Sequence, residues 1–146
     1  MIVISHRGNL NGPDFETENH PDQILKAIKL GLDVEIDVWF KDDSFFLGHD
    51  YPQYEVSDEF LLSIIDNTWI HCKNLEALEV LSQGDDLFNY FWHENDNYTI
   101  TSNEKIWTLP GNKITKHSIC VLPEKYPNVD YSEAYGVCTD FPLNLV

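Results

Sequence analysis

The chain has 146 residues, of which 42% are hydrophobic and 13% aromatic, and this composition predicts one folded domain over residues 1–146 rather than a disordered chain. No apolar run approaches the roughly 20 residues that span a bilayer, and the N-terminal apolar run is too short for a signal peptide. We therefore expect a cytoplasmic protein that does not enter a membrane. The formal net charge of −16 repels nucleic-acid backbones and acidic membranes, so nucleic acid is excluded as a partner. A small phosphodiester stays compatible if a bound cation reverses the local charge.

The first half of the chain alternates predicted strands with predicted helices. Strand 2–6 comes first, and a helix over residues 21–31 follows, with proline in its first turn and glycine at its end. Helices over residues 57–65 and 74–84 begin at serine and asparagine, which are favoured N-cap residues. Further strands of this half are predicted over residues 33–40, 69–73 and 88–93, with a short extended segment over 45–49.

The second half contains short strands without helical patterns between them. Roughly eight strands in all, with early β–α spacing, favour a parallel sheet that closes into a barrel. A full (β/α)₈ barrel usually needs about 200 residues or more. We therefore predict an α/β fold, a reduced TIM-type (β/α) barrel with several helices missing or replaced by loops in the second half. An open α/β sandwich is the alternative, and a homodimer would cover apolar barrel surface that missing helices leave. The late strands are predicted over residues 98–102, 105–109, 118–122 and 135–139.

Two carboxylates on strand 33–40 are the sharpest chemical signal. Glu35 and Asp37 alternate with valine and isoleucine, so both carboxylates point to one face of the strand. A strand covered by helices is expected to be apolar on both faces, and buried carboxylates need a cation or another partner. The pattern thus predicts a cation site, unless the strand lies at an edge with a solvated polar face.

Histidines and cationic side chains follow at the ends of neighbouring strands. His6 and Arg7 end the first strand, where α/β proteins place ligands, and His49 follows the second. Imidazole transfers protons near neutral pH, and guanidinium clamps phosphate through two hydrogen bonds. His71 and Lys73 share one face of the third strand. An inward lysine indicates a phosphate or carboxylate partner, although a structural ion pair would use the same residue types.

Five groups of residues over residues 2–50 match, in order and spacing, the pattern of a known enzyme family, and two weaker matches to that pattern follow. Together they resemble the glycerophosphodiester phosphodiesterase family, part of the superfamily that includes phosphatidylinositol phospholipase C. The groups are His6-Arg7-Gly8, Glu18-Asn19, the helix ending at Gly31, Glu35-Ile36-Asp37-Val38 and Gly48-His49-Asp50, followed by Lys73 and the segment from Gly136 to Pro142.

The resemblance implies a TIM-barrel phosphodiesterase. That family binds a divalent metal, commonly Mg²⁺ or Ca²⁺, and uses two histidines as general acid and base on a small phosphodiester substrate. Carried over to this chain, the metal site would comprise Glu35, Asp37, Glu18 and His71, the acid–base pair His6 and His49, and the phosphate binders Arg7 and Lys73.

Two departures from the family pattern leave other functions open. His71 stands where the family usually has a glutamate ligand two residues before the strand lysine. The chain is also much shorter than usual family members, and most of its second half does not match them well. A non-catalytic module that binds phosphate or sugar phosphate, or a phosphomonoesterase, is therefore the alternative. His93 and Glu94 end the fourth predicted strand, where they would either line the site or belong to an ordinary loop.

Overall fold

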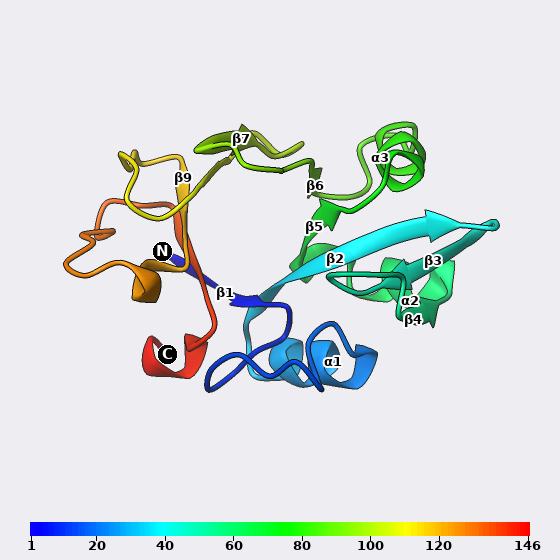
Figure 1. The fold of residues 1–146 in the computed structure, drawn as a ribbon, viewed down its shortest axis with the longest axis horizontal. Coiled ribbons are helices and arrows are strands. Elements are labelled where there is room, and N and C mark those ends of the chain that lie inside the picture. The colour runs from blue at the N-terminus through cyan, green and yellow to red at the C-terminus, as the bar shows by residue number, and fades with distance from the viewer.

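The structure, a computed structural model that describes residues 1–146, contains one ten-stranded sheet curled into half a barrel, with three short α-helices outside it (Figure 1). Seven strands run parallel in the order β6–β5–β2–β1–β10–β9–β8. They are β1 (Ile2–His6), β2 (Asp33–Lys41), β5 (Thr68–Cys72), β6 (Tyr90–Phe91), β8 (Ile106–Thr108), β9 (Ser118–Val121) and β10 (Gly136–Thr139).

The remaining three strands pair antiparallel to their neighbours. β3 (Ser44–Leu47) folds back on the second half of β2, β4 (Tyr54–Val56) pairs with β3, and β7 (Tyr98–Ile100) pairs with β8. The first half of β2 lies between β1 and β5. This long strand therefore leaves the parallel layer at its carboxyl end, where it forms the hairpin that extends away from the curl in Figure 1.

The predicted fold class is wrong. The sheet is not a TIM-type (β/α) barrel, because β6 pairs only with β5 and β7 only with β8, and helices do not alternate with the strands around the curl. After the third helix the chain returns through loops and short 3₁₀ turns such as Pro123–Lys125. Parallel strands are usually joined by helical crossovers, but here the loops are long enough to reverse the chain direction without them.

Two of the three helices begin after their predicted N-cap residues, Ser57 and Asn74, and the first begins at the predicted proline, Pro21. α1 spans Pro21–Lys29, α2 spans Asp58–Ser63 and α3 spans Leu75–Ser82. The Ser57 hydroxyl accepts a hydrogen bond from the backbone N–H of Phe60, and the side-chain Oδ1 of Asn74 accepts one from the backbone N–H of Ala77. Each cap satisfies an amide that the first helical turn leaves without a partner. None of these helices combines the length and apolarity that a membrane span requires.

Two apolar layers lie on opposite faces of the sheet. The outer layer packs the helices on β2, β3 and β5, while the inner layer fills the bottom of the curl. β2 is buried on both faces from Val34 to Val38, as expected for a strand between two layers. The outer layer includes Ile24, Ala27, Val34, Ile36, Leu61, Ile70, Ala77 and Leu81, and the inner layer includes Ile4, Trp69, Phe91, Trp107, Ile119 and Cys138.

Strand boundaries differ from the prediction at β6 and β4. The segment 88–93 forms only the two-residue strand β6, and β4 was not predicted at all. β4 has one buried residue, Val56, and so lacks the alternation that marks a half-buried strand. The strands predicted over 2–6, 33–40 and 69–73 are confirmed within one residue at each end.

Candidate functional site

The site lies at the carboxyl ends of the central parallel strands. Alternate side chains of a strand share a face, and in β1 and β5 the inward apolar residue is followed two positions later by an inward polar one. In β1 Ile4 is followed by His6, and in β5 Trp69 is followed by His71. Asp140 continues the same alternation just beyond β10. The apolar residues fill the curl, and the polar residues gather above them.

A pocket of about 620 Å³ opens over these polar residues. A second wall comes from the second half of the chain and carries both polar and apolar groups, including His93, Glu94, Trp107 and Leu122. Six of the eight residues predicted for the site line the pocket, namely His6, Arg7, Glu35, His49, His71 and Lys73. Asp37 and Glu18 are buried behind this surface.

Three potential metal ligands form a compact cluster on the pocket wall. One ligand atom each from Glu35, Asp37 and His71 lies within 4.8 Å of the others. Nδ1 of His71 is 3.1 Å from Oδ1 of Asp37 and 3.9 Å from Oε1 of Glu35. Oε2 of Glu35 and Oδ1 of Asp37 are buried without a hydrogen-bond partner. Buried oxygens of this kind are costly unless a cation compensates them, so the donor set fits a divalent metal.

The two carboxylates of the cluster have opposite pKa shifts. Burial and the adjacent Asp37 carboxylate raise the pKa of Glu35 above its usual range. Burial alone would raise the pKa of Asp37 as well, but His71 and Arg7 outweigh burial and lower it. Two like charges at this separation disfavour joint ionisation, and a bound cation would remove that conflict.

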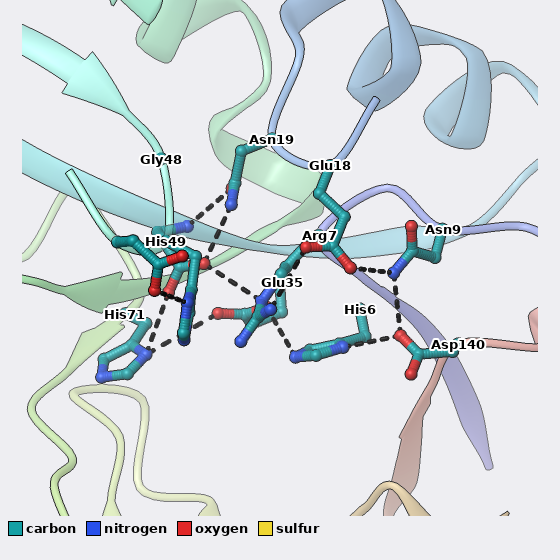
Figure 2. A network of polar contacts seen from close by, with 12 residues as sticks. His6, Arg7, Asn9, Glu18, Asn19, Glu35, Gly48, His49, His71 and Asp140 are labelled. Carbon is teal, nitrogen blue, oxygen red and sulfur yellow. Dashed lines mark hydrogen bonds and ion pairs between the residues drawn. The ribbon is translucent and has the colours of Figure 1, made fainter. Parts of the chain in front are cut away.

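Arg7 lies beside the cluster and pairs with two carboxylates, of which Glu18 is labelled in Figure 2. Its Nε lies 3.3 Å from Oδ2 of Asp37, and its Nη1 lies 3.2 Å from Oε2 of Glu18. The other oxygen of Glu18 accepts a hydrogen bond from Asn9 at 3.1 Å. Both oxygens of Glu18 are therefore occupied by protein donors, and the structure places Glu18 as a partner of Arg7 beside the three-residue cluster rather than within it.

Asn19 positions Asp37 from the loop before α1. Its side-chain Nδ2 donates a hydrogen bond to Oδ2 of Asp37 at 2.9 Å, and its side-chain Oδ1 accepts one from the backbone N–H of Asp37 at 3.0 Å. Asn19 adopts a left-handed backbone with a φ of 60°, a conformation that asparagine tolerates better than most residues. This loop therefore locks one carboxylate oxygen of Asp37 and leaves the other directed at Glu35 and His71.

His6 forms a second polar group with Asp140. Nδ1 of His6 lies 2.7 Å from Oδ1 of Asp140, which also accepts a hydrogen bond from Asn9 at 2.9 Å. Burial alone would raise the pKa of Asp140, but the bond with His6 outweighs burial and lowers it. Because an ionised carboxylate can only accept, the His6 proton sits on Nδ1 and Nε2 is left as a proton acceptor. Nε2 lies 3.8 Å from Oε2 of Glu35.

His49 reaches the pocket from the turn after β3. Its side chain is 40% exposed, and its Nδ1 lies 2.8 Å from the exposed carboxylate of Asp50. The preceding Gly48 is tied to β2, since its N–H donates to the Asp37 carbonyl at 3.1 Å and its own carbonyl accepts from the Trp39 indole at 2.6 Å. The hairpin thus brings His49 to the same pocket as His6, which is the last residue of β1.

Sequence reasoning missed three participants in this network. Asp140 could have been found by extending the inward alternation of the last strand from Cys138, a signal that was present in the predicted segment 135–139. Asn9 lies in an irregular loop, where no periodic pattern marks a functional side chain. The carbonyl of His93 contacts Nε2 of His71 at 3.0 Å, and a backbone acceptor leaves no trace in residue identity.

Comparisons of this chain with models of protein families, with curated proteins and with solved structures found no match.

Proposed function

We propose that this chain is a metal-dependent phosphodiester hydrolase that acts on a small glycerophosphodiester-like substrate by two-histidine general acid–base catalysis. The observation that supports this most is the meeting of His6, from the end of β1, and His49, from the turn after β3, in one pocket with Glu35, His71 and Lys73. Such a set offers a proton acceptor, a proton donor, a cation site and a phosphate-binding cation within one water-accessible space. The resemblance to the glycerophosphodiester phosphodiesterase family favours the same reaction.

The proposed roles follow from the hydrogen bonds of each histidine. Asp140 holds the proton of His6 on Nδ1, so Nε2 accepts the proton of the attacking hydroxyl. A new P–O bond forms as the bond to the leaving alcohol breaks. His49, partly exposed at the pocket mouth, donates a proton to the leaving oxygen. Both histidines are reset when His6 releases its proton to solvent and His49 takes one up from solvent.

Charge on the phosphate is matched by the cationic side of the pocket. Lys73 lines the pocket wall beside His71 and binds phosphate oxygens as a point charge. Arg7 contributes its positive potential from between Glu18 and Asp37. A divalent metal held by Glu35, Asp37 and His71 would neutralise the negative charge that grows on the phosphoryl group.

The test is turnover of bis-nitrophenyl phosphate and glycerophosphodiesters with chelator-treated protein to which single divalent metals are added back. We expect His6→Gln and His49→Gln each to lower kcat by about 10²–10⁴-fold, the usual contribution of one acid or base. The exposed His117 lies outside the pocket, so His117→Gln is the matched control and should keep wild-type kcat. Circular dichroism should show that all three variants keep the wild-type fold.

Near-full turnover by either pocket variant would contradict the two-histidine scheme. Metal and phosphate binding without release would instead indicate a binding module, a function that the engagement of Arg7 by two carboxylates favours. Release from nitrophenyl phosphate alone would indicate a phosphomonoesterase.

A further inference from the structure

The donor atoms of the three-residue cluster differ in kind, and this difference bears on which metal they hold. We infer that Glu35, Asp37 and His71 form a mixed oxygen–nitrogen site that selects Zn²⁺ or a similar imidazole-binding transition ion over Mg²⁺ and Ca²⁺. The inference deepens the proposed function, because it assigns the metal class of the same site. Its test requires no turnover and therefore stands apart from the hydrolysis.

The nitrogen that faces the carboxylates is identified by the other side of the imidazole ring. Nε2 of His71 lies 3.0 Å from the carbonyl oxygen of His93, and a carbonyl can only accept a hydrogen bond. Nε2–H is therefore the donor toward His93, and Nδ1 is the nitrogen that faces Oδ1 of Asp37 at 3.1 Å and Oε1 of Glu35 at 3.9 Å. A metal ion bound there would take the place of a proton on Nδ1. One imidazole nitrogen and two carboxylate oxygens thus surround a position suited to a cation.

The orientation of the His71 ring is set by two further contacts. The ring stacks on Phe91 with centroids 5.2 Å apart and an interplanar angle of 11°. Phe91 is itself buried in the inner apolar layer, and the His93 carbonyl is part of the backbone. Metal-binding histidines usually donate their second N–H to such an acceptor, which fixes both tautomer and orientation. Nδ1 is thus held toward the carboxylates before any metal binds.

The carboxylates each present an oxygen that the protein leaves without a donor. Oδ2 of Asp37 is occupied by Asn19 and Arg7, whereas Oδ1 has no hydrogen-bond partner. Oε2 of Glu35 is likewise buried without a partner, in a residue only 2% exposed. The unpartnered Oε2 of Glu35 faces Nε2 of His6 at 3.8 Å, and the other oxygen, Oε1, faces His71. The cluster is therefore more than a group of acids, because buried oxygens of both carboxylates meet an imidazole nitrogen.

The identity of the third donor favours one class of ion. Mg²⁺ and Ca²⁺ prefer sites made only of oxygen, and Mg²⁺ gives up its water reluctantly. Imidazole nitrogen suits Zn²⁺, Fe²⁺ and Ni²⁺. Because Zn²⁺ binds most protein sites more tightly than Mg²⁺ does, the informative quantity is how far the Zn²⁺/Mg²⁺ affinity ratio depends on His71.

The first experiment measures that ratio by calorimetric titration of the metal-free protein with Zn²⁺ and with Mg²⁺. His71→Glu makes the cluster all-oxygen, and we expect the ratio to fall by roughly 10- to 100-fold, the scale on which changes around metal ligands act. His117→Gln should leave the ratio unchanged. An equal ratio in wild type and His71→Glu would overturn the inference. A wild-type protein that binds neither ion would also overturn it, because that result is expected if a charged His71 simply pairs with Asp37.

The second experiment uses the wild-type protein and so does not depend on the folding of a variant. Co²⁺, a paramagnetic substitute for Zn²⁺, should give a strongly shifted proton resonance from the Nε2–H of His71, and this resonance should disappear in D₂O. It should persist in His6→Gln and His49→Gln. Absence of any shifted exchangeable resonance in the Co²⁺-loaded wild type would overturn the inference. Zn²⁺ binding through His71 without phosphodiester cleavage would overturn only the proposed function.

Discussion

At the residue scale, the buried bond between His6 and Asp140 links the site to the stability of the protein. Asp140 is 3% exposed and accepts hydrogen bonds from both His6 and Asn9. These donors lower its pKa against the opposing effect of burial. Asp140 therefore serves two purposes, since it sets the tautomer of His6 and ties the last strand to the loop after the first.

The replacement Asp140→Asn tests the stabilising role. We expect the free energy of unfolding at neutral pH to fall by about 2 kcal/mol, because hydrogen bonds to a charged group are lost. The folded pKa of Asp140 is lowered, so the stability that it contributes is present above its unfolded pKa of about 4 and is lost as pH falls through the folded pKa. The difference between wild type and variant should shrink accordingly below about pH 4. Urea unfolding across this pH range is the measurement.

The control for this prediction is Asp50→Asn, which removes the carboxylate partner of the other pocket histidine. Asp50 is 82% exposed, and exposed ion pairs contribute about 0–1 kcal/mol. If Asp50→Asn destabilised the protein as much as Asp140→Asn, burial would not be the reason for the effect.

At the element scale, the β2–β3 hairpin decides where His49 lies. Gly48 has a φ of +153°, and a Cβ atom there would overlap the carbonyl oxygen of Tyr51. Backbone atoms cannot rotate away as a side chain can. The turn therefore keeps its path only with glycine, and that path delivers His49 to the pocket.

We expect Gly48→Ala to cost about 1–3 kcal/mol of unfolding free energy, as other overpacked substitutions do, and to lower kcat/KM because the turn shifts His49. Gly31, at the end of α1, is the matched control, since it has a φ of +85° but nothing within 4 Å of an added Cβ. Gly31→Ala should cost about 1–2 kcal/mol for the left-handed backbone and leave kcat/KM unchanged. Chemical denaturation and steady-state kinetics of the two variants separate the clash at Gly48 from the strain of a left-handed backbone. Equal losses of kcat/KM in the two variants would contradict the role of the turn.

At the scale of the whole molecule, the net charge of −16 is a source of self-repulsion in the folded state. Raising the ionic strength from about 10 mM to about 150 mM shortens the Debye length from about 30 Å to about 8 Å. We therefore expect the free energy of unfolding to rise with added salt, by similar amounts in sodium chloride and choline chloride. Urea titrations at each salt concentration measure this change, and a fall in stability with both salts would show that attractive surface pairs dominate instead.

Most individual elements could be predicted from local patterns, but the fold class could not. The alternation in strands 2–6, 33–40 and 69–73 and the caps at Ser57 and Asn74 depend on neighbours within a few residues, which the sequence displays directly. Strand pairing depends on partners far apart in the chain, such as Ile4 of β1 with Cys138 of β10. No local pattern specified that β6 and β7 would end the sheet without pairing with each other, so counting strands led to a closed barrel that does not form.

The residue types of the candidate site were determined by the sequence alone, because histidine, carboxylate and lysine at strand ends carry their chemistry wherever they lie. Their convergence was decided by tertiary structure. The curl of the sheet brings His6, Glu35 and His71 to one wall, and the hairpin adds His49. The tertiary structure also decides which atoms lack a hydrogen bond to the rest of the protein. Asn19 occupies one oxygen of Asp37, and the bond of Nε2 to the His93 carbonyl turns Nδ1 of His71 inward. Hydrogen bonds between distant segments form only in the folded chain, and they select which lone pairs face the pocket.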